Sequence, residues 1–373
     1  MRRPAPRARL SALVIGLLGA RLGAAAAPAD SPSPPVPQDF AAVVPGYAFE
    51  FPRDFGSHPQ FRIEWWYVTG WLETPTHESL GFQITFFRNR PAAQDDNPSR
   101  FAPRQLLIAH CAISDPAHSG LWHDQRVRRA GLGLAEATPS DTRVWIDDWL
   151  LERRDDRYLA HIRARDFSLE LTLAPTQPPL LNGDHGFSQK APAGRSASYY
   201  YSQPHLHVTG NIARADRRSA VSGEAWLDHE WSSEYLDPAA VGWDWIGLNL
   251  DDGGAIMAFR LRDRQGRAYW SGGTVREAGG QVRSLGTSDI EFTPLRRWRS
   301  PRSAVDYPVS FTVRVGERRF ELAPLLDDQE NDARLSSGAI YWEGAVSAVQ
   351  SQRTIGRGYL ELTGYDQPLS LGR

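Results

Sequence analysis

The sequence has very little of the two residues that most often supply covalent chemistry. One cysteine, Cys111, occurs in 373 residues, so no internal disulfide can form and the fold must depend on its apolar core. One lysine, Lys190, stands against 41 arginines. Schiff-base and pyridoxal mechanisms would all fall on this one residue in a Pro- and Gly-rich segment, so we set them aside.

Long apolar runs are also lacking, since spanning a bilayer takes about 20 apolar residues. The run Leu10–Leu18 is shorter, follows a basic start, and precedes four alanines at positions 24–27. This order is typical of a cleaved secretory signal peptide, which we expect at residues 1–27. The pair Arg2-Arg3 leaves twin-arginine export open beside ordinary secretion. We expect a periplasmic or secreted protein with no transmembrane segment in the mature chain.

Positive charge is scarce once the leader is removed. Loss of the five leader arginines changes the formal net charge from −2 to −7. Nucleic-acid binding needs a basic face, so an acidic mature chain argues against such a partner. Neither a G-x-S-x-G nucleophile elbow nor a Walker or Rossmann glycine pattern occurs. Classical serine hydrolysis therefore finds little support, and no cofactor is expected.

Short strand patterns fill the chain, and we find no long amphipathic helix pattern. The proline-rich run PADSPSPPVP follows the leader, and residues 28–44 are interpreted as a linker. The segment 175–204 predicts a long loop whose residues Tyr199–Tyr201 form a lid or rim. Aromatic and β-branched runs between turns predict strands near residues 64–72, 81–88, 106–114, 145–151, 158–164, 167–173, 205–212, 221–230, 243–250, 255–261, 309–315, 319–322, 344–349 and 358–365.

Two segments of the chain are alike. Residues 65–72 (WWYVTGWL) and 243–250 (WDWIGLNL) are each followed by a turn and an apolar strand, which favours two copies of one β-unit. Strands with apolar residues on both faces favour barrels over a flat sheet. We predict an all-β protein with an N-terminal domain at 45–234 and a C-terminal domain at 235–373.

The stretch Glu224–Leu250 carries the densest chemistry. It places His229 between Asp228 and Glu230, and it holds tryptophans at positions 226, 231, 243 and 245. Acids and an imidazole among indoles indicate an apolar pocket with a few polar groups, where pKa values shift and a hydrophobic ligand is oriented. On a strand, His229 and Trp231 would share one face while Asp228 and Glu230 share the other.

Several ordered motifs resemble the bacterial family that joins carotenoid 1,2-hydratases to AttH-type secreted lipocalin-like proteins. They are EWWYVTGWL (64–72), GFQITFFR (81–88), SGEAWLDHEWSS (222–233), GWDWIGLNL (242–250) and GRGYLELTGY (356–365). The resemblance covers nearly all of the mature chain. It implies two tandem lipocalin-like antiparallel β-barrels. Its exported members often occur beside ABC-transporter permeases, which implies such permeases as partners, and some carry the label of secreted hydrolase.

The resemblance also implies a reaction. In the carotenoid hydratases, water adds across an isolated alkene without a cofactor, so an acid must protonate the alkene and a base must activate water. Aromatic faces can stabilise the carbocation between these steps. The family's His-x-Trp motif matches His229 and Trp231. The hydratases carry a Tyr-x-Asp pair on a following strand, where residues 257–261 read MAFRL, so Asp244 or Asp228 would take the acid role.

Each candidate has a structural alternative. His229 could be a buried, hydrogen-bonded histidine, and core packing accounts for the tryptophans as well. His205-x-His207 has metal-compatible spacing, but no third and fourth ligand is convincingly placed, so no metal is expected. The residues expected to line a ligand cavity are Trp66, Trp226, Trp231, Trp243, Trp245, Tyr201, His205 and His207.

We therefore expect an exported lipocalin-like protein that holds a lipid or isoprenoid-like ligand, with or without cofactor-free hydratase activity. Two alternatives stay open. The protein could be a non-catalytic envelope carrier or an accessory protein of an ABC transporter, or it could be a secreted hydrolase.

Overall fold

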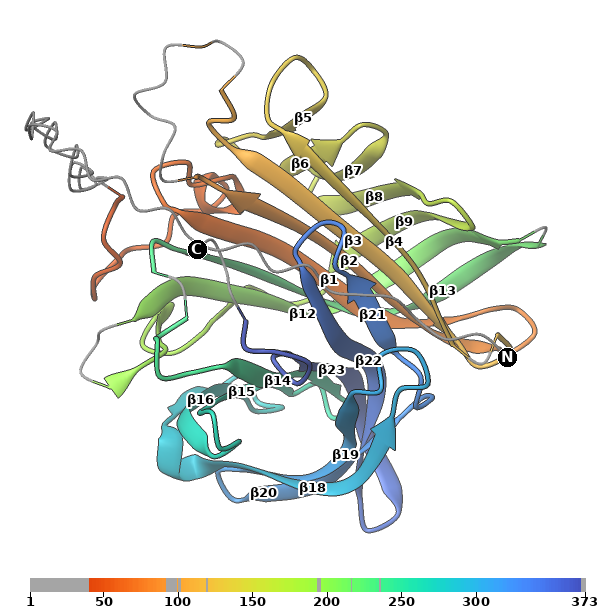
Figure 1. Cartoon of the computed structure of the whole chain (residues 1–373). Helices are drawn as coiled ribbons and strands as arrows, with labels where there is room; N and C mark the ends of the chain where they lie inside the picture. The colour runs from red at the N-terminus through yellow and green to blue at the C-terminus, as the bar shows by residue number, and fades with distance from the viewer. Residues whose placement is uncertain are drawn as a thin grey trace, which may run out of the picture. The chain divides into compact units, whose positions relative to one another are not determined.

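The computed structural model describes residues 40–91, 99, 102–118, 120–192, 196–215, 217–234 and 236–369. The expected leader, residues 1–27, and most of the expected linker at 28–44 lie outside the described residues. In the described part of the chain, the short 3-10 helices η1 (Arg53–Phe55) and η3 (Thr287–Asp289) accompany two large antiparallel sheets (Figure 1). Within the described residues, we find no helix with the length and apolar character to span a bilayer.

The first sheet runs in the order β4-β3-β2-β1-β13-β12-β9-β8-β7-β6-β5, and β10 and β11 pair with β12. Its strands are β1 (Ile63–Glu73), β2 (Ser79–Asn89), β3 (Leu106–Asp115), β4 (Gly120–Arg129), β5 (Ala135–Ala137), β6 (Arg143–Ile146), β7 (Trp149–Arg154), β8 (Arg157–Arg163), β9 (Phe167–Pro175), β10 (Leu180–Leu181), β11 (Phe187–Gln189), β12 (Ala197–Arg214) and β13 (Arg217–Ser232).

The second sheet runs in the order β17-β16-β15-β14-β23-β22-β20-β19-β18, and β21 pairs with β22. Its strands are β14 (Gly242–Leu250), β15 (Ala255–Arg262), β16 (Ala268–Arg276), β17 (Val282–Leu285), β18 (Ile290–Arg299), β19 (Asp306–Val315), β20 (Arg318–Pro324), β21 (Glu330–Ala333), β22 (Ala339–Gln350) and β23 (Arg353–Leu362).

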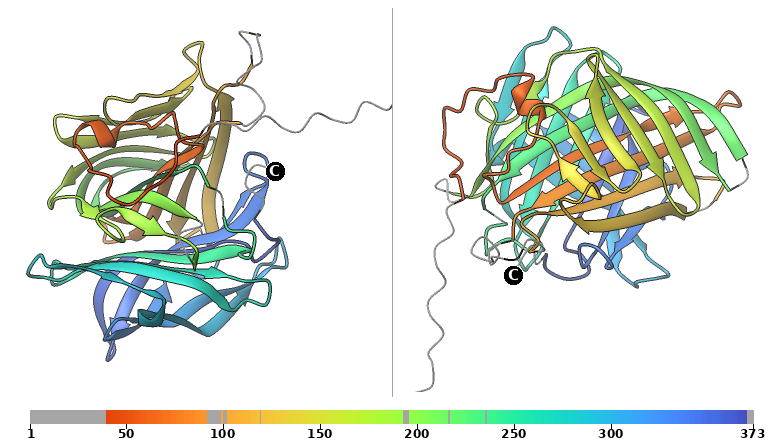
Figure 2. Two further views of the ribbon diagram at one scale, coloured as in Figure 1. Left: turned by 90° about the vertical axis from the view of Figure 1, so that its left-hand side faces the viewer. Right: turned by 90° about the horizontal axis from the view of Figure 1, so that it is seen from above.

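Each sheet curls until its ends approach one another (Figures 1 and 2). In the first sheet, Arg126 on β4 donates from Nη1 to the carbonyl of Ile146 on β6 at 3.3 Å. In the second, Arg260 on β15 donates from Nη1 to the carbonyl of Phe292 on β18 at 2.8 Å. The predicted all-β fold with two lipocalin-like units is confirmed.

Every second side chain along the strands points inward, and these side chains fill the interiors of both barrels. In β9 the buried side chains are every second residue from Phe167 to Leu173, as the sequence pattern predicts. The interior of the first barrel packs one apolar cluster from β1, β2, β3, β9, β12 and β13. The interior of the second packs another from β14, β19, β22 and β23. Both barrels are therefore supported by apolar side chains, without disulfides.

A third apolar cluster lies between the two sheets, and we call this region the junction. It combines side chains of β1, β12 and β13 with side chains of β14, β15, β22 and β23. Trp71 on β1 donates from Nε1 to the carbonyl of Gly358 on β23 at 3.0 Å. Strands β1 and β14 are thus buried on both faces, because one face lines a barrel and the other lines the junction.

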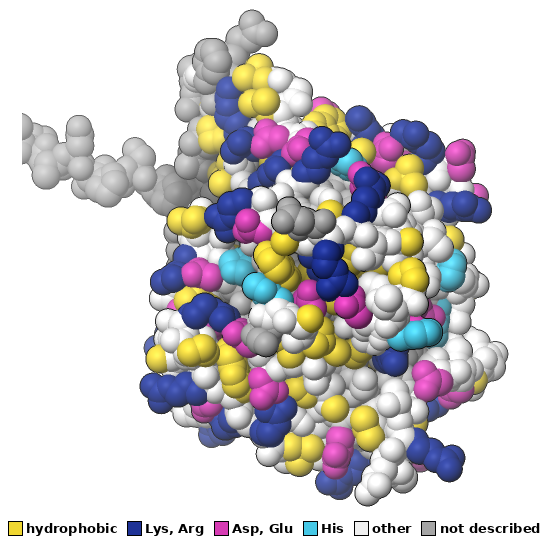
Figure 3. All heavy atoms as spheres, turned by 90° about the vertical axis from the view of Figure 1, so that its right-hand side faces the viewer, with side chains coloured by type: hydrophobic (Ala, Val, Ile, Leu, Met, Phe, Trp, Pro, Cys, Tyr) yellow, Lys and Arg dark blue, Asp and Glu magenta, His cyan; other side chains and the backbone are white. Residues whose placement is uncertain are grey.

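Some predicted details are wrong. Residues 175–204 do not form one loop, because β10 and β11 lie within it and β12 begins at Ala197. Tyr199–Tyr201 therefore belong to a strand and not to a lid. The strand patterns missed β4, β16 and β18, whose outer faces are rich in charged and polar residues. The face shown in Figure 3 intersperses acidic and basic side chains, without a large patch of one sign.

Candidate functional site

The predicted site residues lie in two separate places, on the two sides of strand β13. Tyr201, Trp66, His229 and Trp231 face the interior of the first barrel; Trp226, Asp228, Trp243 and Trp245 lie at the junction. The registers explain the division, because Trp66 and Tyr201 both lie opposite His229, whereas Tyr67 lies opposite Asp228. Neighbouring residues on a strand point to opposite faces, as the sequence analysis expects for His229 and Asp228.

His229 is fully buried inside the first barrel. Its Nε2 lies 2.9 Å from Oε1 of Glu64, and its Nδ1 lies 3.0 Å from the hydroxyl of Tyr201. The ring of Trp66 stacks on the imidazole with a centroid distance of 4.7 Å, and Trp231 lies 4.9 Å away. Both ring nitrogens and one face of His229 are thus occupied by protein groups.

Glu64 is the charged centre of this interior cluster. Although burial opposes its ionisation, Arg88, His229 and His58 hold the pKa of Glu64 well below its usual value. Arg88 donates from Nε to Oε2 of Glu64 at 2.7 Å. His58 lies between two carboxylates, with Nδ1 2.8 Å from Glu64 and Nε2 3.3 Å from Asp54. Burial lowers the pKa of His58, but the hydrogen bonds to Asp54 and Glu64 outweigh burial and raise it overall.

The protonation of His229 follows from this environment. Burial lowers the pKa of His229 to about 4, and the neighbouring Glu64 carboxylate offsets only part of that effect. The neutral ring donates its Nε2–H to Glu64 and accepts at Nδ1 from the Tyr201 hydroxyl. The only ring lone pair that could accept a proton already accepts the hydrogen bond from Tyr201. A general-base role for His229 therefore stays a prediction.

His58, Glu64 and His229 also offer the donor types of a metal centre, with ligand atoms all within 4.8 Å of one another. The N···O separations of 2.8 and 2.9 Å fit hydrogen bonds. Ligands around a tetrahedral zinc ion would lie roughly 3.4 Å apart. Arg88 also occupies the second oxygen of Glu64. The donor set therefore fits a balanced ion-pair network better than a metal site.

Asp228 lies on the opposite face of β13, buried in the junction. Its Oδ1 accepts hydrogen bonds from Trp226 Nε1 at 2.6 Å and Ser202 Oγ at 2.5 Å, and its Oδ2 accepts from Tyr200 at 2.6 Å. Burial raises the pKa of Asp228 to about 7, although these three donors act in the opposite direction. Trp245 donates to the Tyr200 hydroxyl at 3.0 Å, which extends the network to the second sheet.

Two further acids lie on the second-sheet side of the junction. Burial raises the pKa of Glu361 to about 7, with the carboxylates of Asp228 and Glu230 adding to the shift. Trp243 donates from Nε1 to Oε2 of Glu361 at 3.0 Å and partly opposes it. Glu343 pairs with Glu361 across β22 and β23, and burial followed by the charge of Glu361 raises the pKa of Glu343 well above its usual value.

Two polar atoms in the junction lack a hydrogen bond of good geometry. Among the described residues, these are the hydroxyl of Tyr67 and Oε1 of Glu343, whose buried side chains lie close enough to influence each other's pKa. Unpaired buried polar atoms are rare in folded proteins because each costs free energy. Tyr67 and Glu343 lie in the junction together with Asp228, Glu230 and Glu361, and we call the four carboxyl groups of this set the junction acids.

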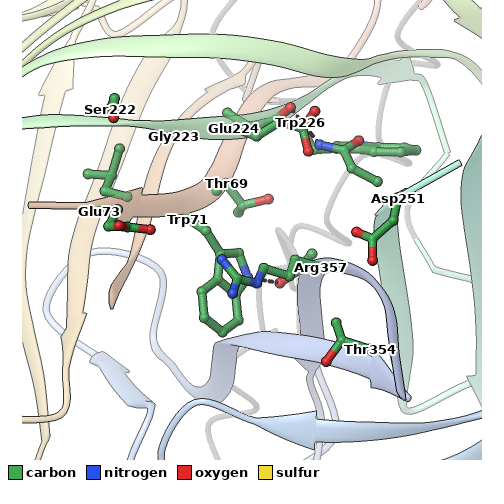
Figure 4. A pocket seen from close by; sticks show the side chains of 15 residues that line it. Thr69, Trp71, Glu73, Ser222, Gly223, Glu224, Trp226, Asp251, Thr354 and Arg357 are labelled. Atoms are coloured by element: carbon green, nitrogen blue, oxygen red, sulfur yellow. Dashed lines mark hydrogen bonds between the residues drawn. The ribbon is translucent and has the colours of Figure 1, made fainter. Parts of the chain in front are cut away.

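A pocket of about 410 Å³ opens at one end of the junction (Figure 4). The indole of Trp226 lines this pocket and also donates to Asp228, so this side chain lies between the pocket and Asp228. Arg357 lies over the ring of Trp71 at 4.9 Å at the pocket wall. The pocket is lined by Thr69, Gly70, Trp71, Leu72, Glu73, Ser222, Gly223, Glu224, Ala225, Trp226, Asn249, Asp251, Thr354, Arg357 and Gly358.

A comparison with protein families decides the relationship that the motifs indicate. The profile described as AttH-like matches residues 42–365. The chain belongs to the AttH-like family. Among curated proteins, none matches the sequence significantly.

Solved structures agree with this assignment of the AttH-like chain. A candidate AttH from Nitrosomonas europaea has 53% sequence identity and a TM-score of 0.82, and the match covers 87% of this chain and 99% of that one. Kievitone hydratase from Nectria haematococca has 17% identity and a TM-score of 0.64, over 82% and 89% of the two chains. CghA has 14% identity and a TM-score of 0.50, over 88% and 97%. The last two likenesses concern the fold alone.

Three predicted residues of the AttH-like chain lie outside both clusters. Asp244 lies in the second barrel, where it accepts from Nε of Arg260 at 2.9 Å and from Nε of Arg262 at 3.0 Å. His205 lies at a β-bulge with a φ of 54°, and its Nδ1 is 2.7 Å from Glu224. His207 is exposed, so the two imidazoles do not share one environment. The geometry does not bring these residues to His229.

A serine–histidine contact bears on the hydrolase alternative. Nε2 of His110 lies 2.8 Å from Oγ of Ser336, and its Nδ1 lies 2.8 Å from the hydroxyl of Tyr341. Ser336 donates to Oε1 of Gln125 at 2.6 Å, and the amide nitrogen of Gln125 donates to a backbone carbonyl, which fixes the amide. The serine proton therefore points to Gln125 and away from His110. This network joins the two sheets and does not form a nucleophile–base pair.

Sequence reasoning did not single out the second-sheet acids or Tyr67. Glu361 lies within GRGYLELTGY and Tyr67 within EWWYVTGWL, two motifs that carry the family resemblance. Glu343 lies in an apolar strand, where a single buried acid is itself a signal. These residues come together only through pairing of distant strands, which the motifs alone do not specify.

Proposed function

We propose that this AttH-like protein is an exported protein that binds a hydrophobic ligand at the junction and carries out a cofactor-free, hydratase-type proton transfer there. One observation carries the proposal: Asp228 and Glu361 both lie in the aromatic junction, where burial raises the pKa of each carboxyl group to about 7. Acids and bases work best when their pKa lies near the operating pH. Buried carboxyl groups with such values are concentrated at functional sites.

The two acids have different surroundings, which favours different roles. Three donors converge on the oxygens of Asp228, an arrangement that suits an ionised carboxylate acting as base. Glu361 has one indole donor, from Trp243, and faces the raised-pKa carboxyl of Glu343, so it is suited to hold a proton and act as acid.

A balanced addition of water can be written with these roles. Glu361 transfers its proton to one alkene carbon, forming a C–H bond with the π electron pair and leaving the other carbon positive. The rings of Trp243 and Trp245 supply faces that attract this charge. A water oxygen forms the C–O bond and gives its proton to Asp228. Proton exchange with solvent then returns both carboxyl groups to their starting states.

The composition of the junction supports an apolar ligand. Tryptophan, tyrosine, phenylalanine and leucine side chains dominate its apolar cluster, and such side chains are typical of small-molecule sites. The pocket beside Trp226 gives a ligand a way toward the acids. We propose a lipid or isoprenoid-like molecule with a double bond as the ligand.

Turnover tests the proposal directly. The mature protein is incubated with an acyclic, lycopene-like carotenoid in detergent, and the product is examined for the mass increase of one water. Asp228→Asn and Glu361→Gln should each reduce kcat by about 100-fold or more, because each removes an acid or base. Glu317→Gln, at an exposed turn, is the matched control and should be fully active. Wild-type protein that turns over no alkene would overturn the proposal.

A carrier role is the second candidate, favoured by the pocket of about 410 Å³ that opens on the junction. Native mass spectrometry of protein purified from its own envelope would then show a bound lipid that survives incubation unchanged. Partnership with an ABC-transporter permease belongs to this candidate and would appear as co-purification of permease subunits.

Export is part of the proposal and has its own test. The basic start, short apolar run and alanine cluster of residues 1–27 support cleavage and release from the cytoplasm. Intact mass of the protein from a periplasmic fraction should correspond to loss of these residues. A full-length mass confined to the cytoplasmic fraction would contradict export.

A further inference from the structure

The single lysine of the chain reaches into the junction. Lys190 follows β11, and its Nζ lies 3.0 Å from Oε1 of Glu230. The same ammonium group lies 4.9 Å from the ring centroid of Tyr200 and 4.2 Å from that of Phe259. The Lys190 side chain is only 18% exposed. One buried carboxylate and two aromatic faces thus enclose a cation.

The enclosing groups are fixed by the two sheets. Glu230 also accepts a hydrogen bond from Ser198 of the neighbouring strand β12. The lysine segment is anchored on both sides, since Trp270 donates to the carbonyl of Gln189 at 2.8 Å and the amide of Lys190 donates to the carbonyl of Ser196 at 2.8 Å. The flexible part of this arrangement is the lysine side chain, with its four-carbon stem.

Four carboxyl groups lie near this position. Glu230, Asp228, Glu361 and Glu343 follow one another through the junction, and in the described part of the chain the only salt bridge to any of them is that from Lys190 to Glu230. Lys190 is therefore the cation that balances Glu230 in this part of the junction.

We propose that the cage of Glu230, Tyr200 and Phe259 is a binding subsite for an organic ammonium group, and that Lys190 is its internal occupant, displaced by an amine-bearing amphiphile. The carboxylate supplies charge pairing, and the two rings supply cation–π attraction, which strengthens when the cation is desolvated. This inference concerns binding alone and goes beyond the proposed hydratase chemistry. A cationic head at the cage would leave the apolar tail among the junction aromatics.

Calorimetric binding to the full mature chain tests the subsite, with octyltrimethylammonium as probe and octanol and octanoate as matched controls. The ammonium should bind at least about tenfold more tightly than either control. Lys190→Met removes the internal competitor and should tighten ammonium binding by about tenfold, whereas Glu230→Gln should abolish the preference. Equal affinity for the three probes, or unchanged affinity in Lys190→Met, would overturn the proposal.

The lysine count allows a second measurement on the unmodified protein. Because Lys190 is the only lysine, acylation by an N-hydroxysuccinimide ester followed by peptide mass spectrometry reports on one side chain. Octyltrimethylammonium should raise the acylation rate of Lys190 several-fold by displacing it into solvent, and octanol should not. A rate that stays constant or falls would refute displacement. Neither assay involves turnover, so the outcome is independent of the hydratase proposal.

Discussion

At the scale of single residues, the neighbouring positions 228 and 229 of β13 differ in how their side chains bind protons. His229 is neutral and held by Glu64 and Tyr201 inside a barrel, whereas Asp228 titrates near neutrality in the junction. Burial acts on both groups by disfavouring the charged form, so it lowers the pKa of the imidazole and raises that of the carboxyl. The same physical cause therefore removes one residue from acid–base work near neutral pH and brings the other into range.

The pKa of Asp228 makes a prediction about stability. Between pH of about 4 and about 7 the folded protein keeps a proton that the unfolded chain has released, so the free energy of unfolding falls as pH rises through this window. Asp228→Asn removes this contribution, which amounts to at most about 4 kcal/mol at roughly 1.4 kcal/mol per pKa unit. In urea unfolding, the variant should lose less stability than wild type between pH 5 and pH 8.

If wild type and Asp228→Asn lost equal amounts of stability between pH 5 and pH 8, the raised pKa of Asp228 would be contradicted. Glu361→Gln should show the same direction of change, because burial also raises the pKa of Glu361.

The interior ion network gives a second prediction. Arg88 and Glu64 are both fully buried, so Arg88→Met removes the guanidinium that pairs with this carboxylate and should cost about 3–5 kcal/mol of unfolding free energy. Arg53 pairs with Asp54 in the same network, but its side chain is 51% exposed. Arg53→Met should therefore cost less than about 1 kcal/mol. Chemical denaturation of both variants measures the difference, and an equal loss would contradict the role of burial.

At the scale of elements, the strands that line the junction approach each other too closely for side chains at certain positions. A Cβ atom on Gly223 of β13 would lie 1.9 Å from the carbonyl oxygen of Trp71 on β1. The obstacle is backbone, which cannot rotate away. The same strands must present a barrel interior on one face and the junction on the other, so their spacing is constrained from both sides.

Gly223→Ala should consequently destabilise the protein by about 3 kcal/mol or more, since it forces β1 and β13 apart. Gly279→Ala is the matched control, because nothing lies within 4 Å of its added Cβ. That variant should stay within about 1 kcal/mol of wild type. Thermal melts of both proteins test the comparison, and a Gly223→Ala protein as stable as the control would show that the strands can adjust.

At the scale of the whole molecule, the junction couples the two sheets through buried polar contacts as well as apolar ones. Asn249 on β14 accepts from the amide of His205 at 3.0 Å and donates to the carbonyl of Ala225 at 3.1 Å. Its side chain thus satisfies backbone groups of both β12 and β13. Separating the sheets would leave these groups and the apolar cluster of the junction exposed at once.

We therefore expect one cooperative unfolding transition in calorimetry, despite two barrels. Asn249→Ala should lower that single transition by about 2–4 kcal/mol, because two buried backbone groups lose their partners. Gln350→Ala removes an exposed side-chain hydrogen bond and should change stability by less than about 0.5 kcal/mol. Two resolved transitions in wild type would show that the barrels unfold independently.

Much of the fold could be predicted from local patterns. The alternation of Phe167 to Leu173 and the two-sided apolar run around Trp66 predict strands, because side-chain direction in a strand depends only on position. The first part of strand β12, before the predicted strand at 205–212, escaped prediction because Ser, Tyr and Pro residues near Ala197 also suit loops, and pairing with β13 overrides that local preference. The candidate site was predicted in part, since the separation of His229 from Asp228 follows from strand periodicity.

The sequence by itself determined the all-β fold, the family and the two faces of the strand that carries His229 and Asp228. These depend on residue type, order and a period of two. Only the tertiary structure decided that Glu361, Glu343, Tyr67 and Lys190 join Asp228, because distant strands β1 and β13 pair in the first sheet and side chains of the second sheet pack against them at the junction. Burial there is a property of the packed sheets, and burial is what moves the pKa values.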